Sequence, residues 1–139
     1  MLRGLKDSGG KWEQSLEYKR SAPQLEIIVG SDTAVLKALE AGLDGSVTGG
    51  GNAVPRVITR IEEHWRAGDK NAAEESQVRL TRWTEARKAA GAHEIAVVKA
   101  TLAKLLPGFT ATVRAPILPC SEEAGAKLAG LTSELVEGQ

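Results

Sequence analysis

Lys6 is the first residue of the chain whose type and position could do chemistry. It follows a short apolar run over residues 2–5 and precedes Asp7-Ser8-Gly9-Gly10. A neutral lysine amine can attack a carbonyl carbon and form an imine, and partial desolvation at the end of a strand favours the neutral form. Taken alone, a lysine at a strand end is more often a solvated side chain. Lys6 is therefore a candidate nucleophile that depends on its surroundings.

Two further apolar runs end at glycine and polar residues. Residues 25–29 lead into Gly30-Ser31-Asp32, and residues 45–48 lead into Gly49-Gly50-Gly51-Asn52. Gly30 also suits a plain turn, and Asp32 also suits a helix cap. A glycine run before a helix can cradle phosphate, but this one lacks the Lys-Ser/Thr ending of a nucleotide loop. Phosphate binding is a minor alternative here.

The other residues that could hold a metal or act as nucleophiles are scattered. His64 and His93 are too isolated to predict a metal site. Cys120 is the single cysteine, which excludes an internal disulfide and a multi-cysteine zinc site. We expect no metal and no cofactor.

Apolar periodicity predicts the elements that position these candidates. Strand, glycine turn and helix recur three times in the first half, most clearly in the helix of residues 54–65, where Pro55 stands in the first turn. This repeat is typical of a parallel α/β sheet. The second half predicts helices over residues 71–90 and 95–106 and a last helix capped by Ser121, with at most a short strand over residues 110–114. We divide the chain into three βα units, residues 1–68, and a helical extension, residues 69–139.

The composition narrows the class of protein. The chain has 139 residues with 18 basic and 18 acidic side chains, an even balance that argues against a nucleic-acid binder. No apolar run approaches the roughly 20 residues that span a bilayer, and the first residues lack the apolar core of a signal peptide. We therefore expect a cytoplasmic protein that binds neither nucleic acid nor membrane.

Five motifs together resemble the dihydrodipicolinate synthase / N-acetylneuraminate lyase family of (β/α)8 class I aldolases. The first resembles that family's Schiff-base strand, the next two its following strand ends, and the last two the joints of its C-terminal extension. In chain order they are Gly4 to Gly10, Gly30-Ser31-Asp32, Gly42 to Thr48 with Asn52, Val98-Lys99-Ala100 and Arg114-Ala115-Pro116.

The resemblance implies a lyase acting on 2-oxo acids, either pyruvate-type or 2-oxo-3-deoxy sugar acids, through a Schiff base on Lys6. Active sites of such barrels lie at the carboxyl ends of the strands. There the resemblance implies a substrate site lined by Ser8, Gly30, Asp32, Val47 and Gly49.

The chain also departs from the family, since a barrel of this kind needs about 250 residues. The resemblance therefore implies strands six to eight of a TIM barrel plus a three-helix extension, without the family's carboxylate-binding loop and proton-shuttling tyrosine. We expect the C-terminal part of something larger, with an apolar inner face formed by Leu5, Ile27 and Val47. An alternative reading is a catalytically incomplete fragment or interaction module. In either case we expect a homo-oligomer or a complementing N-terminal half.

Overall fold

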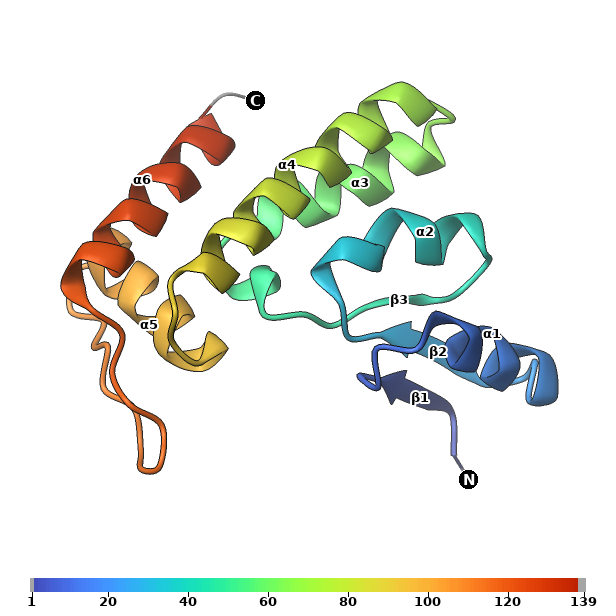
Figure 1. The fold of residues 1–139 in the computed structure, drawn as a ribbon. Coiled ribbons are helices and arrows are strands. Elements are labelled where there is room, and N and C mark those ends of the chain that lie inside the picture. Colours follow the sequence, from blue (N-terminus) through green and yellow to red (C-terminus); the bar gives the residue numbers. More distant parts are fainter. Residues whose placement is uncertain (1, 138–139) are drawn as a thin grey trace.

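The computed structural model describes residues 2–137, in which strands and helices alternate at first and helices follow alone (Figure 1). In chain order the elements are β1 (Gly4–Asp7), α1 (Trp12–Ser21), β2 (Glu26–Val29), α2 (Val35–Glu40), β3 (Gly45–Ser46), α3 (Pro55–Arg66), α4 (Lys70–Ala89), α5 (Glu94–Leu105) and α6 (Glu122–Glu137). Short 3-10 turns, Asp32–Ala34 and Gly50–Asn52, lead into α2 and α3. Each of the three strands is thus followed by a helix, α1, α2 and α3 in turn.

The three strands form one parallel sheet in the order β1-β2-β3. Lys6 is the partner of Ile28 in the register, and Ile28 is in turn the partner of Gly45. β3 is shorter than predicted and ends at Ser46. The Val47 N–H still donates to the Val29 carbonyl at 3.0 Å, but the chain then enters the turn before α3.

The faces of the sheet differ from the prediction. Ile27 is fully buried and, with Leu5, belongs to a cluster that Trp12 and Leu16 of α1 complete. Because side chains alternate along a strand, Lys6 and Ile28 lie on the opposite, open face. The prediction that Leu5 and Ile27 form the inner face was therefore wrong. These two side chains lie under the helix because that contact removes their apolar surface from water.

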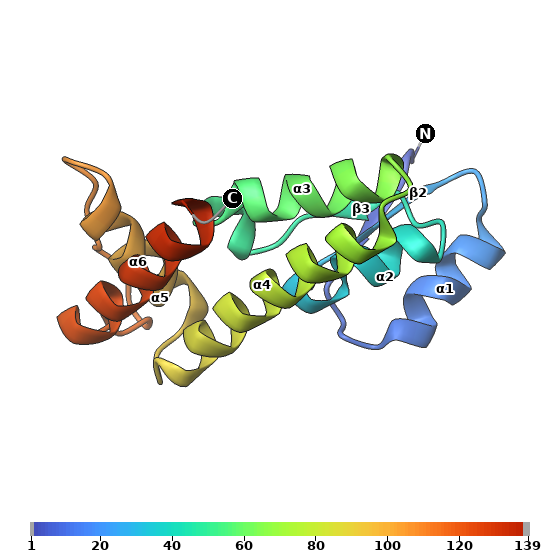
Figure 2. The ribbon, with the colours of Figure 1, turned by 90° about the horizontal axis from the view of Figure 1, so that it is seen from above.

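The main core lies around α4, which runs from beside α3 and α2 to α5 and α6 in both ribbon views (Figures 1 and 2). Leu80 and Trp83 of α4 are fully buried in it, together with Val57 and Ile61 of α3. Leu128 of α6 belongs to the same cluster. One apolar core therefore joins the βα units to the helical extension.

Local signals in the second half are confirmed with one exception. Ser121 accepts a hydrogen bond from the Ala124 N–H at 3.2 Å and so caps α6. The short strand that the sequence allowed over residues 110–114 does not form, since this segment is neither strand nor helix. A strand needs a neighbouring strand for its backbone groups, and instead the Lys99 ammonium donates to the Thr112 carbonyl. Among residues 2–137, no helix has the length and apolar character needed to cross a bilayer.

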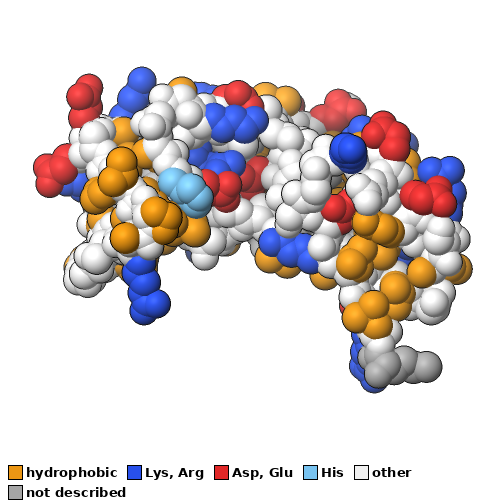
Figure 3. Space-filling view, turned by 60° about the horizontal axis from the view of Figure 1, so that its bottom comes forward, with side chains coloured by type: hydrophobic (Ala, Val, Ile, Leu, Met, Phe, Trp, Pro, Cys, Tyr) orange, Lys and Arg blue, Asp and Glu red, His pale blue; other side chains and the backbone are white. Residues whose placement is uncertain are grey.

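The isolated chain should self-associate. β1 and β3 are both edge strands of the sheet, and unpaired edges template further pairing. Figure 3 shows apolar side chains in two separate areas of one face, and Val47 and Ile95 are 52% and 50% exposed. Sedimentation velocity should show a mass that rises with protein concentration. A monomer that unfolds cooperatively at all concentrations would contradict this prediction.

Candidate active site

The carboxyl ends of β1 and β2 lie side by side, as parallel pairing requires. The Gly30 N–H donates to the Asp7 carbonyl at 2.8 Å, which joins the residues that follow the two strands. Ser8 packs so closely on Gly30 that a Cβ there would lie 3.1 Å from the Ser8 Cα. Val47 is joined to β2 in the same way, through the Val29 carbonyl. The structure thus brings Ser8, Gly30 and Val47 together at the carboxyl end of the sheet.

Lys6 is exposed on the open face of β1. Its side-chain amine forms no hydrogen bond or ion pair with any other residue in the described part of the chain, 2–137. Its sequence neighbour Asp7 points to the opposite face and accepts hydrogen bonds from the Ser15 hydroxyl at 2.6 Å and the Gly9 N–H at 2.8 Å. The side chain of Lys6 is therefore exposed without a polar partner in this part of the chain, and the adjacent carboxylate is held away from it.

The hydroxyl of Ser15 lowers the pKa of Asp7 below its ordinary value of 3.8, the Gly9 N–H lowers it further, and burial opposes both effects. Ser15→Ala should therefore move the Asp7 carboxyl titration, followed by NMR, upward. Because the folded-state pKa lies below the unfolded one, this carboxylate stabilises the fold above about pH 4 and loses its contribution as pH falls through the lowered pKa. Ser21→Ala, on the exposed side of α1, is the control. A Ser15→Ala titration equal to that of the unmutated chain would contradict the assignment.

A hollow of about 250 Å³ lies beside these strand ends. Ser8, Gly30 and Ser31 line it, together with Trp12 and Lys37 from α1 and α2. The Lys37 ammonium lies 4.3 Å from the centroid of the Trp12 ring. Lys6 does not line this hollow, which opens on the side of the sheet that the helices cover. The hollow and the amine are therefore separate features.

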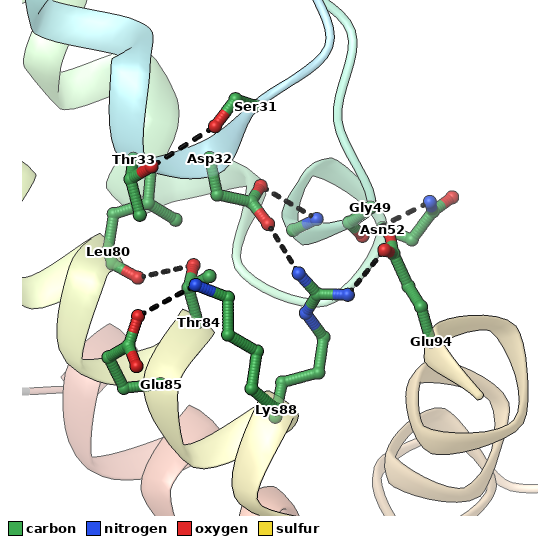
Figure 4. Close-up of polar contacts among 12 residues, drawn as sticks. Ser31, Asp32, Thr33, Gly49, Asn52, Leu80, Thr84, Glu85, Lys88 and Glu94 are labelled. Atoms are coloured by element: carbon green, nitrogen blue, oxygen red, sulfur yellow. Dashed lines mark hydrogen bonds and ion pairs between the residues drawn. The ribbon is translucent and has the colours of Figure 1, made fainter. Parts of the chain in front are cut away.

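Asp32 is the most buried of the predicted site residues, at 4% exposure. Its carboxylate accepts hydrogen bonds from the Gly50 N–H at 3.0 Å and from Arg87 Nη2 at 3.4 Å (Figure 4). Arg87 Nη1 in turn pairs with Glu94 at 2.5 Å. Both oxygens of Asp32 are thus engaged within the chain, and its side chain does not cap its own helix.

Gly49 lies under the carboxylate of Glu94, which would collide with a Cβ at this position. Thr48 precedes it, and its hydroxyl oxygen is buried with no hydrogen-bond partner among residues 2–137. Sequence reasoning missed Thr48, although a hydroxyl residue at a strand end between Val47 and Gly49 was a usable signal.

Sequence reasoning also missed Arg87 and Glu94. Arg87 stands four residues after Trp83 and seven after Leu80, so helical spacing places it on the buried stripe of α4. That spacing could have distinguished it from the exposed charges around it. The described residues contain no group of three side chains arranged to hold a metal ion.

The fold and the site together place the chain in the class of parallel α/β proteins. Its exposed lysine lies on the open face of the sheet, close to glycine-rich strand ends. The sequence profile of the dihydrodipicolinate synthetase family matches residues 1–135. The chain belongs to this family.

Two relatives show how far the likeness extends. The 2-dehydro-3-deoxy-phosphogluconate/2-dehydro-3-deoxy-6-phosphogalactonate aldolase of Sulfurisphaera tokodaii is 31% identical over 123 residues, which are 88% of this chain and 41% of that protein. The crystal structure of KD(P)GA from T. tenax superposes with a TM-score of 0.82 at 29% identity, over 99% of this chain and 48% of that one.

A third likeness concerns the fold alone. YagE, a prophage protein of the dihydrodipicolinic acid synthase family from E. coli K12, solved in complex with pyruvate, matches with a TM-score of 0.82 at 22% identity, over 97% of this chain and 46% of that one. The chain thus spans less than half the length of these relatives, and its α/β fold matches part of their (β/α)8 barrels. The named relatives are aldolases and a DapA-like lyase, and the chain covers 41–44% of each of these proteins.

Proposed function

We propose that this chain is the Schiff-base-bearing part of a class I aldolase that acts on 2-oxo acids through Lys6. The observation that carries the proposal is the place of Lys6: exposed, without a polar partner among residues 2–137, and on the open face of a parallel strand. Relatives named as aldolases of 2-oxo-3-deoxy acids support this substrate class. We assign residues 1–68 to barrel strands six to eight with their helices, and residues 69–139 to the helical extension.

The proposed chemistry begins with the neutral amine of Lys6. Its nitrogen attacks the C2 carbonyl of the 2-oxo acid, and loss of water from the carbinolamine leaves an imine. In the cleavage direction a base takes the proton of the C4 hydroxyl, the C3–C4 bonding electrons move to the protonated imine, and an aldehyde leaves. Protonation of the resulting enamine at C3 and hydrolysis then release pyruvate and the free lysine.

The base that takes the proton of the C4 hydroxyl has to come from outside the described residues around Lys6. Tyr18, the single tyrosine of the sequence, lies on α1, where its hydroxyl oxygen accepts a hydrogen bond from Gln14 Nε2 at 2.6 Å. We therefore assign the proton relay and the carboxylate-binding loop to a complementing half. That half would pair with the edges of β1 and β3, cover the open face and desolvate the Lys6 amine.

The free sheet edges also favour a second candidate function, an interaction module without activity of its own. Both candidates need the same partner, five βα units, and differ in whether the assembled barrel turns over substrate. The N-terminal part of the Sulfurisphaera tokodaii aldolase is a suitable complementing half, because this chain matches 41% of that protein.

Pyruvate release from 2-oxo-3-deoxygluconate is the test of the proposed function. We expect the mixture of this chain and the complementing half to release pyruvate. N-acetylneuraminate, assayed in a separate reaction, is the alternative substrate, and each half alone is the control. An assembled but inactive mixture would leave the interaction module as the function. Turnover by the 139-residue chain alone would refute the need for a second half.

A further inference from the structure

The long helix α4 reaches the loop after β2 with two polar side chains. Gln77 donates through Nε2 to the Asp32 carbonyl at 3.0 Å and accepts through Oε1 from the Leu36 N–H at 2.9 Å. Arg87 approaches the same loop almost three turns later and pairs with the Asp32 carboxylate. A helix of the C-terminal extension thus fixes both the backbone and the side chain of this loop.

The guanidinium of Arg87 joins three parts of the molecule (Figure 4). Nη2 pairs with Asp32 on the loop after β2, and Nη1 pairs with Glu94 at the start of α5. Through the other oxygen of Asp32 the link continues to the Gly50 N–H on the loop after β3. One side chain therefore ties the ends of two neighbouring strands to the extension.

The ion pair between Arg87 and Asp32 is buried, so the loss of either partner is costly. The side chains of Arg87 and Asp32 are only 10% and 3% exposed, so water replaces little of what either partner loses if the other is removed. Nε of Arg87 is buried with no hydrogen-bond partner among residues 2–137, so the guanidinium is oriented by the two carboxylates and by the Trp83 ring, whose centroid lies 5.8 Å from Arg87 Cζ.

Gly49 and Gly50 lie in close contact with the two carboxylates that Arg87 joins. A Cβ on Gly50 would lie 2.5 Å from Asp32 Oδ1, and a Cβ on Gly49 would meet the Glu94 carboxylate. The loop after β3 can approach only because these positions carry no side chain. A shift of the Asp32 carboxylate would therefore be transmitted to Gly50 through the hydrogen bond that joins them.

We propose that Arg87 is a positioning residue of the candidate site, which acts through Asp32 to fix the separation of the loops that follow β2 and β3. Gly30 and Val47 stand at the starts of these two loops. Arg87 therefore sets how far apart the two loops lie at the end of the sheet that carries Lys6. The consequence for substrate rests on the proposed function, whereas the effect on the loops does not.

Amide hydrogen exchange of Gly50, measured by NMR on the full chain, tests the positioning directly. We expect Arg87→Gln to raise the Gly50 exchange rate at least tenfold, and Arg87→Lys and Glu94→Gln to raise it less. The control is Arg82→Gln, on the same helix, whose ion pair with Glu134 is 57% and 58% exposed. Exchange at α1 amides should stay unchanged in all four variants.

Pyruvate trapping on Lys6 by borohydride, in the presence of the complementing half, gives the second readout. We expect Arg87→Gln to raise the half-saturating pyruvate concentration about tenfold and Arg87→Lys to restore most of the loss. Should Arg87→Gln fail to fold, Glu94→Gln, whose side chain is 46% exposed, decides the matter.

Gly50 exchange that is unchanged in both Arg87→Gln and Glu94→Gln, or in Glu94→Gln alone if the former does not fold, would overturn the proposal. If the unmutated chain traps no pyruvate, the proposed function fails. Gly50 exchange still decides the role of Arg87.

Discussion

Lys6→Ala is expected to abolish the pyruvate adduct that borohydride traps on the assembled halves. The amine nitrogen of Lys6 is the atom that becomes part of the imine, and alanine offers no nucleophile in its place. The expected adduct is confined to the peptide that contains Lys6, identified by mass spectrometry after reduction and digestion. Without the complementing half we expect no adduct, because imine formation needs a bound carboxylate and a proton relay, and each proton-transfer group is typically worth about 10²–10⁴ in rate.

Lys11→Ala is the matched control, since Lys11 is an exposed lysine on the loop after β1 that lines the separate hollow. Its adduct level should equal that of the unmutated chain. An adduct that persists in Lys6→Ala would remove Lys6 as the nucleophile. An adduct of equal yield on the chain alone would instead show that no second half is required.

Trp83→Ala should cause the largest loss of stability of any single change in the core. Trp83 is fully buried, and its indole N–H donates to the Thr132 hydroxyl at 3.0 Å, which joins α4 to α6. Truncating a buried tryptophan costs about 3–5 kcal/mol, a large part of the roughly 5–15 kcal/mol by which a domain is stable. Urea unfolding followed by circular dichroism should show the midpoint fall accordingly.

Val78→Ala is the control for this substitution, because Val78 lies on the same helix and is 67% exposed. Its effect should stay within about 0.5 kcal/mol. A Trp83→Ala loss below about 1 kcal/mol, far under the usual cost, would mean that α4 does not form the centre of the core. In that case the link from Arg87 to the strand ends would also need another support.

Local patterns in the sequence determined the order of the elements. The glycine that follows each apolar run, Pro55 in the first turn of α3 and the Ser121 cap of α6 act on their immediate neighbours, so they can be read along the chain. The same patterns placed Lys6 on a parallel strand, next to the strand ends that carry Ser8 and Gly30. The motif register further identified the family that the profile match shows.

Only the tertiary structure decided the partners of the polar side chains. Asp32 reads equally well as a helix cap or a substrate contact, and its partner Arg87 stands 55 residues further along. Apolar alternation identifies two faces of a strand but not which face a helix covers, so Ile27 was assigned to the wrong side. Contacts of this kind depend on how α1 and α4 pack, and packing is set by the whole core rather than by neighbours in sequence.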